Sequence, residues 1–270
     1  MRYLCPVICA NNLNQDHVKI ILKIICAVIL FASLGSCTKD ISVGGDDNGT
    51  QRNVGLRVFF SYQGAEFSKD SIYYDAAGNP YQIDELKMIV SDFFITHLGD
   101  TIKDTTNFFV VVPEVRDYQL LELPTGSYSG SYGFTIGLDA FDNMKDPSQF
   151  TMLSGLRDPG LYRGASGNYS GYSFLKIKGK VWDVTDSTTT EWAFDYEMAD
   201  SLSLTRARNK NFSIVSDVDA SFEVVIDVDR IMKPFDLLTV DEIKSQSSDA
   251  TDYAFAQLLR LQLDSSIVMY

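Results

Sequence analysis

Hydrophobic and polar residues alternate with a period of two along much of the chain from about residue 54 onward. The clearest run is the segment 222–228, whose apolar members are Phe222, Val224, Ile226 and Val228. A period of two is typical of a strand that buries one face, so these side chains are predicted to lie in the core. The segment 174–181 alternates in the same way, and its pattern predicts a solvent-facing row of Lys176, Lys178 and Lys180.

Short runs rich in β-branched and aromatic residues, separated by Gly, Asn, Asp and Pro, predict further strands. They lie at 56–60, 88–98, 108–112, 128–138 and 191–198. Helix-forming composition is confined to 139–150, 237–244 and 253–263. The sequence therefore predicts an all-β fold, an antiparallel β-sandwich of immunoglobulin-like or related type. Short helical insertions and a helical C-terminal segment complete it.

The first 36 residues differ from the rest and predict an export signal. Lys19 and Lys23 precede a largely apolar run at 24–34, which is shorter than the about 20 residues that cross a bilayer. The sequence Leu34-Gly35-Ser36-Cys37 follows and resembles the lipobox of bacterial lipoproteins. We therefore predict a signal peptide at 1–36, a lipid anchor on Cys37 and a Gly-rich flexible tether at 37–53. The alternative is an uncleaved N-terminal helix with a chance cysteine.

Cysteine usage and charge narrow the class of protein. Three cysteines leave with the signal and the fourth is Cys37, so the predicted sandwich at 54–270 has no disulfide and no thiolate metal ligand. Removing the three basic residues and one acidic residue of the signal takes the net charge from −13 to −15. Such a field repels phosphates, so no nucleic-acid partner is predicted. The simplest role of the acidic charge is solubility.

Several segments follow one another in an order that resembles a known family. They are 73–81, 86–93, 123–130, 134–139, Asp158-Pro159 and 171–179. This order is similar to that of the MbnP-like domain family, named after a copper-binding partner protein of methanobactin gene clusters. The resemblance covers roughly 54–232 and implies a link to copper. Lys39-Asp40, just after the predicted anchor, is a partial match to the export signal of Bacteroidota surface lipoproteins.

The residues must supply suitable ligands if copper is bound, and copper in oxidising compartments favours imidazole and sulfur ligands. The predicted sandwich contains one histidine, His97. Family members often carry histidine in the first strand and in a later strand, where this chain has Phe60 and Glu197. Arg163 stands in the loop that bears the family's tryptophan. Copper is thus implied by resemblance alone, and no cofactor is firmly implied by the residues.

The candidate metal ligands that remain are Glu197, Asp139, Asp142 and His97. Carboxylates suit calcium better than copper. The alternative for the two aspartates is a solvated loop with a capping residue, and for His97 an exposed strand end. Methionines form no Met-rich motif, and packing in the core is their usual use.

No catalytic constellation accompanies these residues. A Ser-His-Asp triad would need His97, and no Gly-x-Ser-x-Gly elbow occurs. We therefore expect a non-catalytic binding module of the cell envelope, with the membrane and an envelope protein as candidate partners. Its expected location is the outer membrane, on the periplasmic face or the cell surface. The alternative is a structural or adhesive surface subunit that binds glycan or protein.

The lipid anchor leads to a direct prediction. Replacing Cys37 by Ser removes the thiol that would carry the lipid, so Cys37→Ser should accumulate as uncleaved precursor and take up no labelled fatty acid. Gel mobility and acyl labelling measure both effects. A Cys26→Ser variant is the matched control, because Cys26 lies inside the predicted signal. Normal processing and detergent partitioning of Cys37→Ser would contradict the lipobox.

Overall fold

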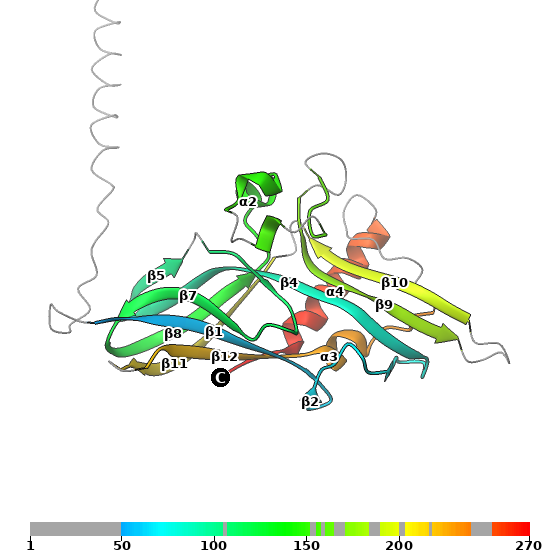
Figure 1. The fold of residues 1–270 in the computed structure, drawn as a ribbon, viewed down its shortest axis with the longest axis horizontal. Helices are drawn as coiled ribbons and strands as arrows, with labels where there is room; N and C mark the ends of the chain where they lie inside the picture. The colour runs from blue at the N-terminus through cyan, green and yellow to red at the C-terminus, as the bar shows by residue number, and fades with distance from the viewer. Residues whose placement is uncertain are drawn as a thin grey trace, which may run out of the picture. The chain divides into compact units, whose positions relative to one another are not determined.

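Two β-sheets packed face to face form the described part of the protein. The computed structural model describes residues 50–104, 107–151, 155–157, 160–164, 171–183, 190–199, 203–215, 218–238 and 250–270. For 190, 192, 194–199 and 250–253 it describes the backbone alone. The arrangement of the strands is shown in Figure 1.

The first sheet, sheet A, is built around the strand that opens the described chain. Its order is β13-β12-β1-β2, and β7 also pairs with β1. The bounds are β1 Gln51–Tyr62, β2 Ala65–Glu66, β7 Asp117–Pro124, β12 Ala220–Asp227 and β13 Ile267–Met269. β1 begins three residues before the predicted boundary, so 51–53, which we assigned to the tether, are strand residues.

The second sheet, sheet B, is organised on one long strand, β4. Its order is β10-β9-β4-β8-β11, and the short strands β3, β5 and β6 also pair with β4. The main bounds are β4 Pro80–His97, β8 Gly126–Ile136, β9 Ser173–Asp183, β10 Thr190–Ala199 and β11 Leu204–Ile214. The short strands are β3 Tyr73–Tyr74, β5 Asp100–Asp104 and β6 Phe109–Val111. Each strand predicted from the sequence overlaps one of these, which confirms the all-β sandwich.

One strand pair departs from the expected antiparallel pattern. β1 and β12 run parallel, in a register that extends from Val54 opposite Ala220 to Ser61 opposite Asp227. Parallel neighbours need a crossover connection, and here more than half of the chain, residues 63–219, lies between the two strands. Local alternation cannot distinguish the two directions, because a strand of either direction shows the same period of two. Sheet A is therefore mixed rather than antiparallel.

The side chains of β12 form the centre of the core, as the alternation predicts. Phe222, Val224, Ile226 and Val228 are all at most 3% exposed. Val228 begins helix α3 (Val228–Met232) instead of continuing the strand. The Phe222 ring faces rings from three strands of sheet B, with centroid distances of 5.8, 4.1 and 4.9 Å to Phe93, Tyr132 and Phe212. Such pairs contribute about 0.5–1.5 kcal/mol each beyond area burial.

The predicted row of solvent-facing lysines is wrong at one position. Lys176 is 8% exposed, whereas Lys178 and Lys180 are half-buried. The Lys176 ammonium donates to the Gly160 carbonyl oxygen at 2.6 Å, because the segment before β9 folds over this end of the strand. Lys180 lies 3.1 Å from Glu191, and this carboxylate raises the pKa of Lys180.

The helices confirm the expected insertions and C-terminal segment. They are α2 Ala140–Asn143, the 3-10 turns Pro147–Gln149 and Gly155–Arg157, α3, and α4 Ala250–Ser266. The helix predicted at 237–244 falls mostly outside the described residues, and Leu237 and Leu238 lie in a turn. Among the described residues no helix is long and apolar enough to span a membrane.

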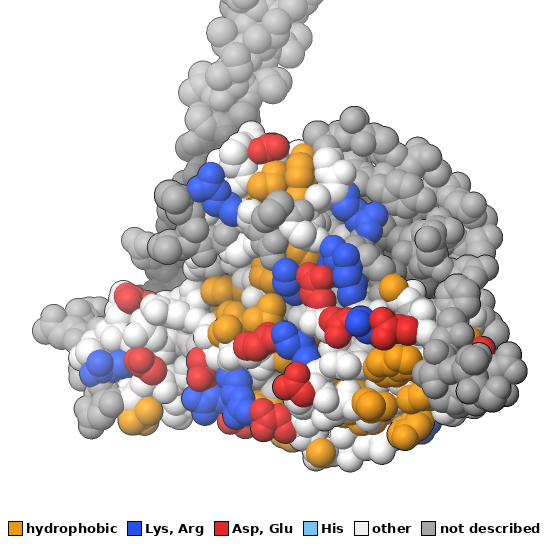
Figure 2. All heavy atoms as spheres, turned by 45° about the vertical axis from the view of Figure 1, so that its right-hand side comes forward, with side chains coloured by type: hydrophobic (Ala, Val, Ile, Leu, Met, Phe, Trp, Pro, Cys, Tyr) orange, Lys and Arg blue, Asp and Glu red, His pale blue; other side chains and the backbone are white. Residues whose placement is uncertain are grey.

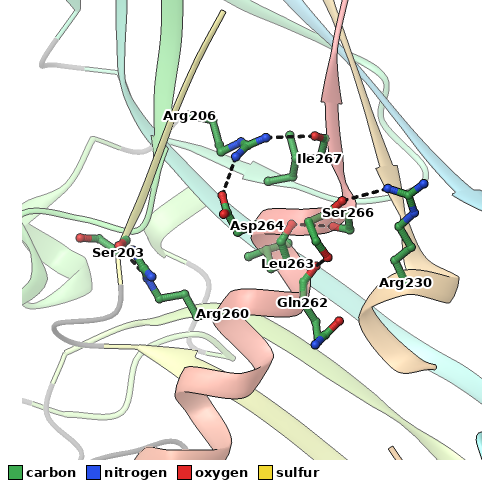
Figure 3. Close-up of polar contacts among 10 residues, drawn as sticks. Ser203, Arg206, Arg230, Arg260, Gln262, Leu263, Asp264, Ser266 and Ile267 are labelled. Atoms are coloured by element: carbon green, nitrogen blue, oxygen red, sulfur yellow. Dashed lines mark hydrogen bonds and ion pairs between the residues drawn. The ribbon is translucent and has the colours of Figure 1, made fainter. Parts of the chain in front are cut away.

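The C-terminal segment fastens the two sheets together. β13 pairs with β12 of sheet A, with Met269 opposite Val224. Arg206 of sheet B binds the Asp264 carboxylate at 2.6 Å and donates to the Ile267 carbonyl at 3.3 Å (Figure 3). From the same sheet the Tyr132 hydroxyl donates to the Tyr270 carbonyl at 2.6 Å. The segment after α4 is thus bonded to both sheets at one edge of the sandwich.

The β3–β4 turn is held by a single buried carboxylate. Asp75 accepts through Oδ1 from the backbone nitrogens of Ala77 and Asn79, at 3.0 and 2.8 Å. Its Oδ2 accepts from the backbone nitrogen of Leu237 at 2.9 Å and from the Asn79 amide at 3.1 Å. This family-like turn therefore has a structural use, since it ties the β4 hairpin to the chain that follows α3.

The assignment of the β12 core face is testable with two neighbouring substitutions. Val224 is fully buried, and Ser221 is exposed on the opposite face of the same strand. We expect Val224→Asp to abolish folding, because an unpaired buried carboxylate costs much of the ~5–15 kcal/mol that stabilises a domain. Ser221→Asp should change the free energy of unfolding by less than about 0.5 kcal/mol. Circular dichroism with urea titration measures both, and a stable Val224→Asp protein would contradict the assignment.

Candidate metal ligands and the loop block over sheet B

The described residues between β8 and β9 are called the loop block; they are 137–151, 155–157, 160–164 and 171–172, and they lie over part of sheet B. Its buried apolar side chains are Leu138, Phe150, Leu156, Leu161 and Tyr172. They belong to the same cluster of buried apolar residues as Phe174, which alternates with the core-facing Leu175 and therefore points away from sheet A. α2 stands above the strands in Figure 1. The loop block thus makes a second apolar layer on the outer face of sheet B.

One asparagine joins the two halves of the loop block. Asn143, at the end of α2, is 4% exposed, and its Oδ1 accepts from the Tyr172 backbone nitrogen at 2.8 Å. The amide lies so close to Gly171 that a Cβ there would meet it at 2.5 Å. Gly171 also has a φ of +88°, which L side chains rarely adopt. The contact therefore requires glycine for two independent reasons.

The carboxylates of the loop block are engaged in local structure. Asp139 caps α2, accepting from the Asp142 backbone nitrogen at 2.7 Å. Asp142 is buried and forms an ion pair with Lys145. Asp146 caps the next turn, and the hydrogen bonds from Ser148 hold the pKa of its carboxyl below the usual range. Capping is the alternative that the sequence left open for Asp139, and the structure supports it.

His97 lies far along the chain from these residues, at the end of β4 where the hairpin to β5 begins. Its Nδ1 accepts from the Ser129 backbone nitrogen at 3.0 Å, and its ring lies 5.1 Å from the Tyr128 ring. Nδ1 is thus engaged by a backbone donor, which leaves Nε2 as the ring nitrogen that a metal could use. Among the described residues no three His, Cys, Asp or Glu side chains gather in a way that would hold a metal.

The positions that align with the family's copper-related motifs carry basic neighbours. Glu197 lies in β10, where only the backbone is described, and the strand register places it opposite Lys176. Arg163 donates from Nε to the Ser173 hydroxyl at 2.8 Å. Phe60 is 6% exposed in the core. Of the three positions, one holds the cation Arg163, one holds the apolar ring of Phe60, and the third, Glu197, lies opposite the cation Lys176.

Sulfur and phenolate ligands are no better placed. Met88, Met232 and Met269 are buried in the core, and Met144 is exposed on α2. Met152 and the Met198 side chain lie outside the described residues. Tyr172 has a buried hydroxyl without a hydrogen-bond partner, and burial raises its pKa. That phenol stays protonated and is a poor metal ligand.

These observations describe a β-sandwich whose polar groups, where described, cap turns and join loops. The family model of MbnP matches residues 51–249, and the chain belongs to this family. A solved structure of MbnP from Methylosinus trichosporium is similar at 10% sequence identity and a TM-score of 0.47, covering 74% of this chain and 82% of that chain. No curated protein matches the chain.

Family membership makes copper the metal to test, and the described residues do not fit it. Copper sites need imidazole, thiolate or thioether groups that converge on one point. Here the imidazole nitrogen Nδ1 accepts a backbone hydrogen bond, Arg163 stands in one motif loop, and Lys176 lies opposite Glu197 in the strand register. Cys37, the predicted lipid anchor, lies outside the described residues.

The sequence reading missed the residues that organise the loop block. Asn143 and Gly171 are 28 positions apart, and no periodic pattern connects them. Lys176 was placed in solvent, since alternation says nothing about a loop that returns over the strand. The one available signal was the Gly171-Tyr172 pair within a family motif, which marks a place where the backbone is closely approached.

Two effects of a substitution at Gly171 can be measured separately: the overlap with the Asn143 amide and the backbone strain at positive φ. Gly171 and Gly78 have nearly equal φ values of +88° and +89°, but a Cβ at Gly78 would meet nothing within 4 Å. Gly78→Ala should therefore show the backbone strain alone, about 1–2 kcal/mol. We expect Gly171→Ala to cost about 1–3 kcal/mol more, because the new methyl group overlaps the Asn143 amide. Equal losses in urea denaturation would show that the amide moves aside freely.

Proposed function

We propose that this protein is a lipid-anchored, non-catalytic binding module of the bacterial cell envelope that has the MbnP fold without a copper site. The observation that carries the proposal is the use of the candidate ligands as structural groups. Asp139 is a cap, Asp142 pairs with Lys145, and His97 accepts from Ser129. The Ser148 hydroxyl donates to the Asp146 carboxylate at 2.6 Å, but this aspartate caps the adjacent turn, which favours a structural use of the pair.

The envelope location is supported by the sequence before the sandwich. The predicted tether of 37–53 becomes shorter, because β1 begins at Gln51. Thirteen residues, 38–50, then separate Cys37 from the strand. An extended chain spans about 3.3–3.6 Å per residue, so the sandwich would lie within some tens of ångströms of the membrane. An envelope protein or an extracellular polymer is then within reach as a partner.

The charge distribution supports the absence of a nucleic-acid partner. In Figure 2 acidic and basic side chains are interspersed on one face, between separate hydrophobic patches. Several charges of the described residues are paired, as in Arg57 with Asp117 at 2.6 Å and Lys87 with Glu85 at 3.0 Å. Paired charges leave little net cationic field, and the chain as a whole carries −13. Phosphate polymers therefore find no attraction here.

The copper proposal is tested by competition. We expect the mature chain, purified in detergent, to take up no stoichiometric copper(I) from a chromogenic chelator, because a single imidazole, engaged through Nδ1 by Ser129, supplies too few soft or imidazole ligands. His97→Ala is the matched variant and should behave like the parent in this titration. It should also lose about 1 kcal/mol of stability, since the Ser129 nitrogen loses its acceptor. One equivalent of copper retained by the parent would overturn the proposal.

A further inference from the structure

The outer face of β8 and β11 differs in chemistry from the other outer faces of the sandwich. Every second residue of the two paired strands points away from the core, and this set contains no charged side chain. It is called the neutral face. Its central members are Ser127, Ser129, Ser131, Asn209, Asn211 and Ser213. All are exposed except Ser131, which is half-buried.

The pairing register of β8 and β11 brings the polar side chains of the neutral face together in rows. Ser131 lies opposite Asn209, Ser129 opposite Asn211 and Ser127 opposite Ser213, so hydroxyl and amide groups form rows across the strands. Thr135 and Thr205 continue the rows, with hydroxyl oxygens 3.0 Å apart. On the neighbouring β4, the Thr96 hydroxyl lies 2.8 Å from that of Ser131. These contacts hold the side chains in place, while each hydroxyl keeps further donor or acceptor capacity.

One aromatic ring lies within this polar surface. Phe94 of β4 is half-buried and covers Gly133, where a Cβ would lie 2.6 Å from the ring and 2.3 Å from the Arg206 carbonyl oxygen. Glycine is therefore required at position 133, because any side chain there would overlap the Phe94 ring and the backbone of β11. The ring is bordered by Lys103 of β5, whose ion pair with Asp92 at 3.0 Å marks the limit of the neutral face.

The contrast with the rest of the molecule is informative. On the β4–β9 part of sheet B, Glu85 and Lys87 lie opposite Lys178 and Lys176. On sheet A, Arg57 pairs with Asp117, and Glu223 is exposed opposite it. Charged residues would be the ordinary means of keeping an outer face of this acidic protein in water. Their absence from the outer-face positions of β8 and β11 therefore needs another explanation, since the charges of β11, including the exposed Arg208 and Lys210, lie at the alternate positions.

Building on the proposed binding role, we propose that the neutral face binds a neutral polysaccharide. Ser and Asn side chains both donate and accept hydrogen bonds, which matches sugar hydroxyls, and Phe94 offers a flat apolar surface to the carbon face of a sugar ring. A neutral polymer is not repelled by the net charge of −13. A protein partner fits less well, because protein interfaces have an apolar core, whereas the neutral face carries small or polar side chains with Phe94 of β4 beside it.

Affinity electrophoresis tests the proposal with defined polymers. Native gels would contain dextran, yeast mannan, arabinoxylan or mixed-linkage β-glucan, with polygalacturonate as the charged comparison. We expect the detergent-purified mature chain to be retarded by at least one neutral polymer and not by polygalacturonate. The Asn209→Ala/Asn211→Ala double variant should lose at least about fivefold in affinity, because it removes two amides from the face. Both positions are exposed, so the melting temperature should not change.

The matched control is Gln119→Ala/Ser221→Ala, which removes two exposed uncharged side chains from the outer face of sheet A. It leaves the net charge and hence the native mobility unchanged, and should bind like the parent. Absence of retardation by every neutral polymer, or equal retardation of the two double variants, would overturn the inference. Lipid attachment and the lack of copper uptake are measured in separate experiments. A chain that is lipidated and takes up no copper but binds no polymer would therefore contradict the polysaccharide inference and leave the proposed function standing.

Discussion

The packing of Phe222 between the two sheets is the contact on which the rest of the structure depends. Its ring comes from β12 of sheet A and meets Phe93, Tyr132 and Phe212 on β4, β8 and β11 of sheet B. Three strands are thereby fixed against a fourth. Phe222 lies opposite Leu56 in the parallel pairing of β12 with β1. The chain between the two strands must therefore bring β12 back beside β1 in this register for the Phe222 ring to reach its partners. The C-terminal segment then holds the same edge through Arg206 and Tyr132.

A rigid sandwich of this kind allows its outer faces to take different chemistry. The β4–β9 part of sheet B carries opposed charges and the loop block, whereas β8 and β11 present hydroxyls and amides. Outer-face residues contribute little to the stability of a sandwich, so their composition is free to serve binding. The same separation lets the outer-face chemistry of a family member change while the fold is kept. The fold needs the inner faces, and the family-like turn at Asp75 and the Gly171 contact are needed to close loops.

The loop block shows how polar residues that suggest a metal site serve structure instead. Asp139 and Asp146 each cap a helical turn, and Asn143 replaces a backbone partner for Tyr172. Short helices leave several backbone nitrogens without partners, and carboxylates next to them are the usual remedy. A cluster of acids in a loop is therefore explained by local hydrogen bonding before any cation is needed. Lys145 and Lys176, both close to these segments, add charge that opposes a cation.

The sequence by itself determined the strands, the face of β12 that is buried and the few helical segments, because side-chain alternation is a local property. The family resemblance at 54–232 was likewise readable from ordered motifs, and the family match at 51–249 confirms it. Tertiary structure alone decided the parallel pairing of β1 with β12, the burial of Lys176 and the contact between Asn143 and Gly171. Each of these joins residues that are distant in the chain. The neutral face belongs to the same group, since its rows exist only once β8 and β11 are in register. Alternation shows which side of a strand is wet, but only the register shows which wet side chains become neighbours.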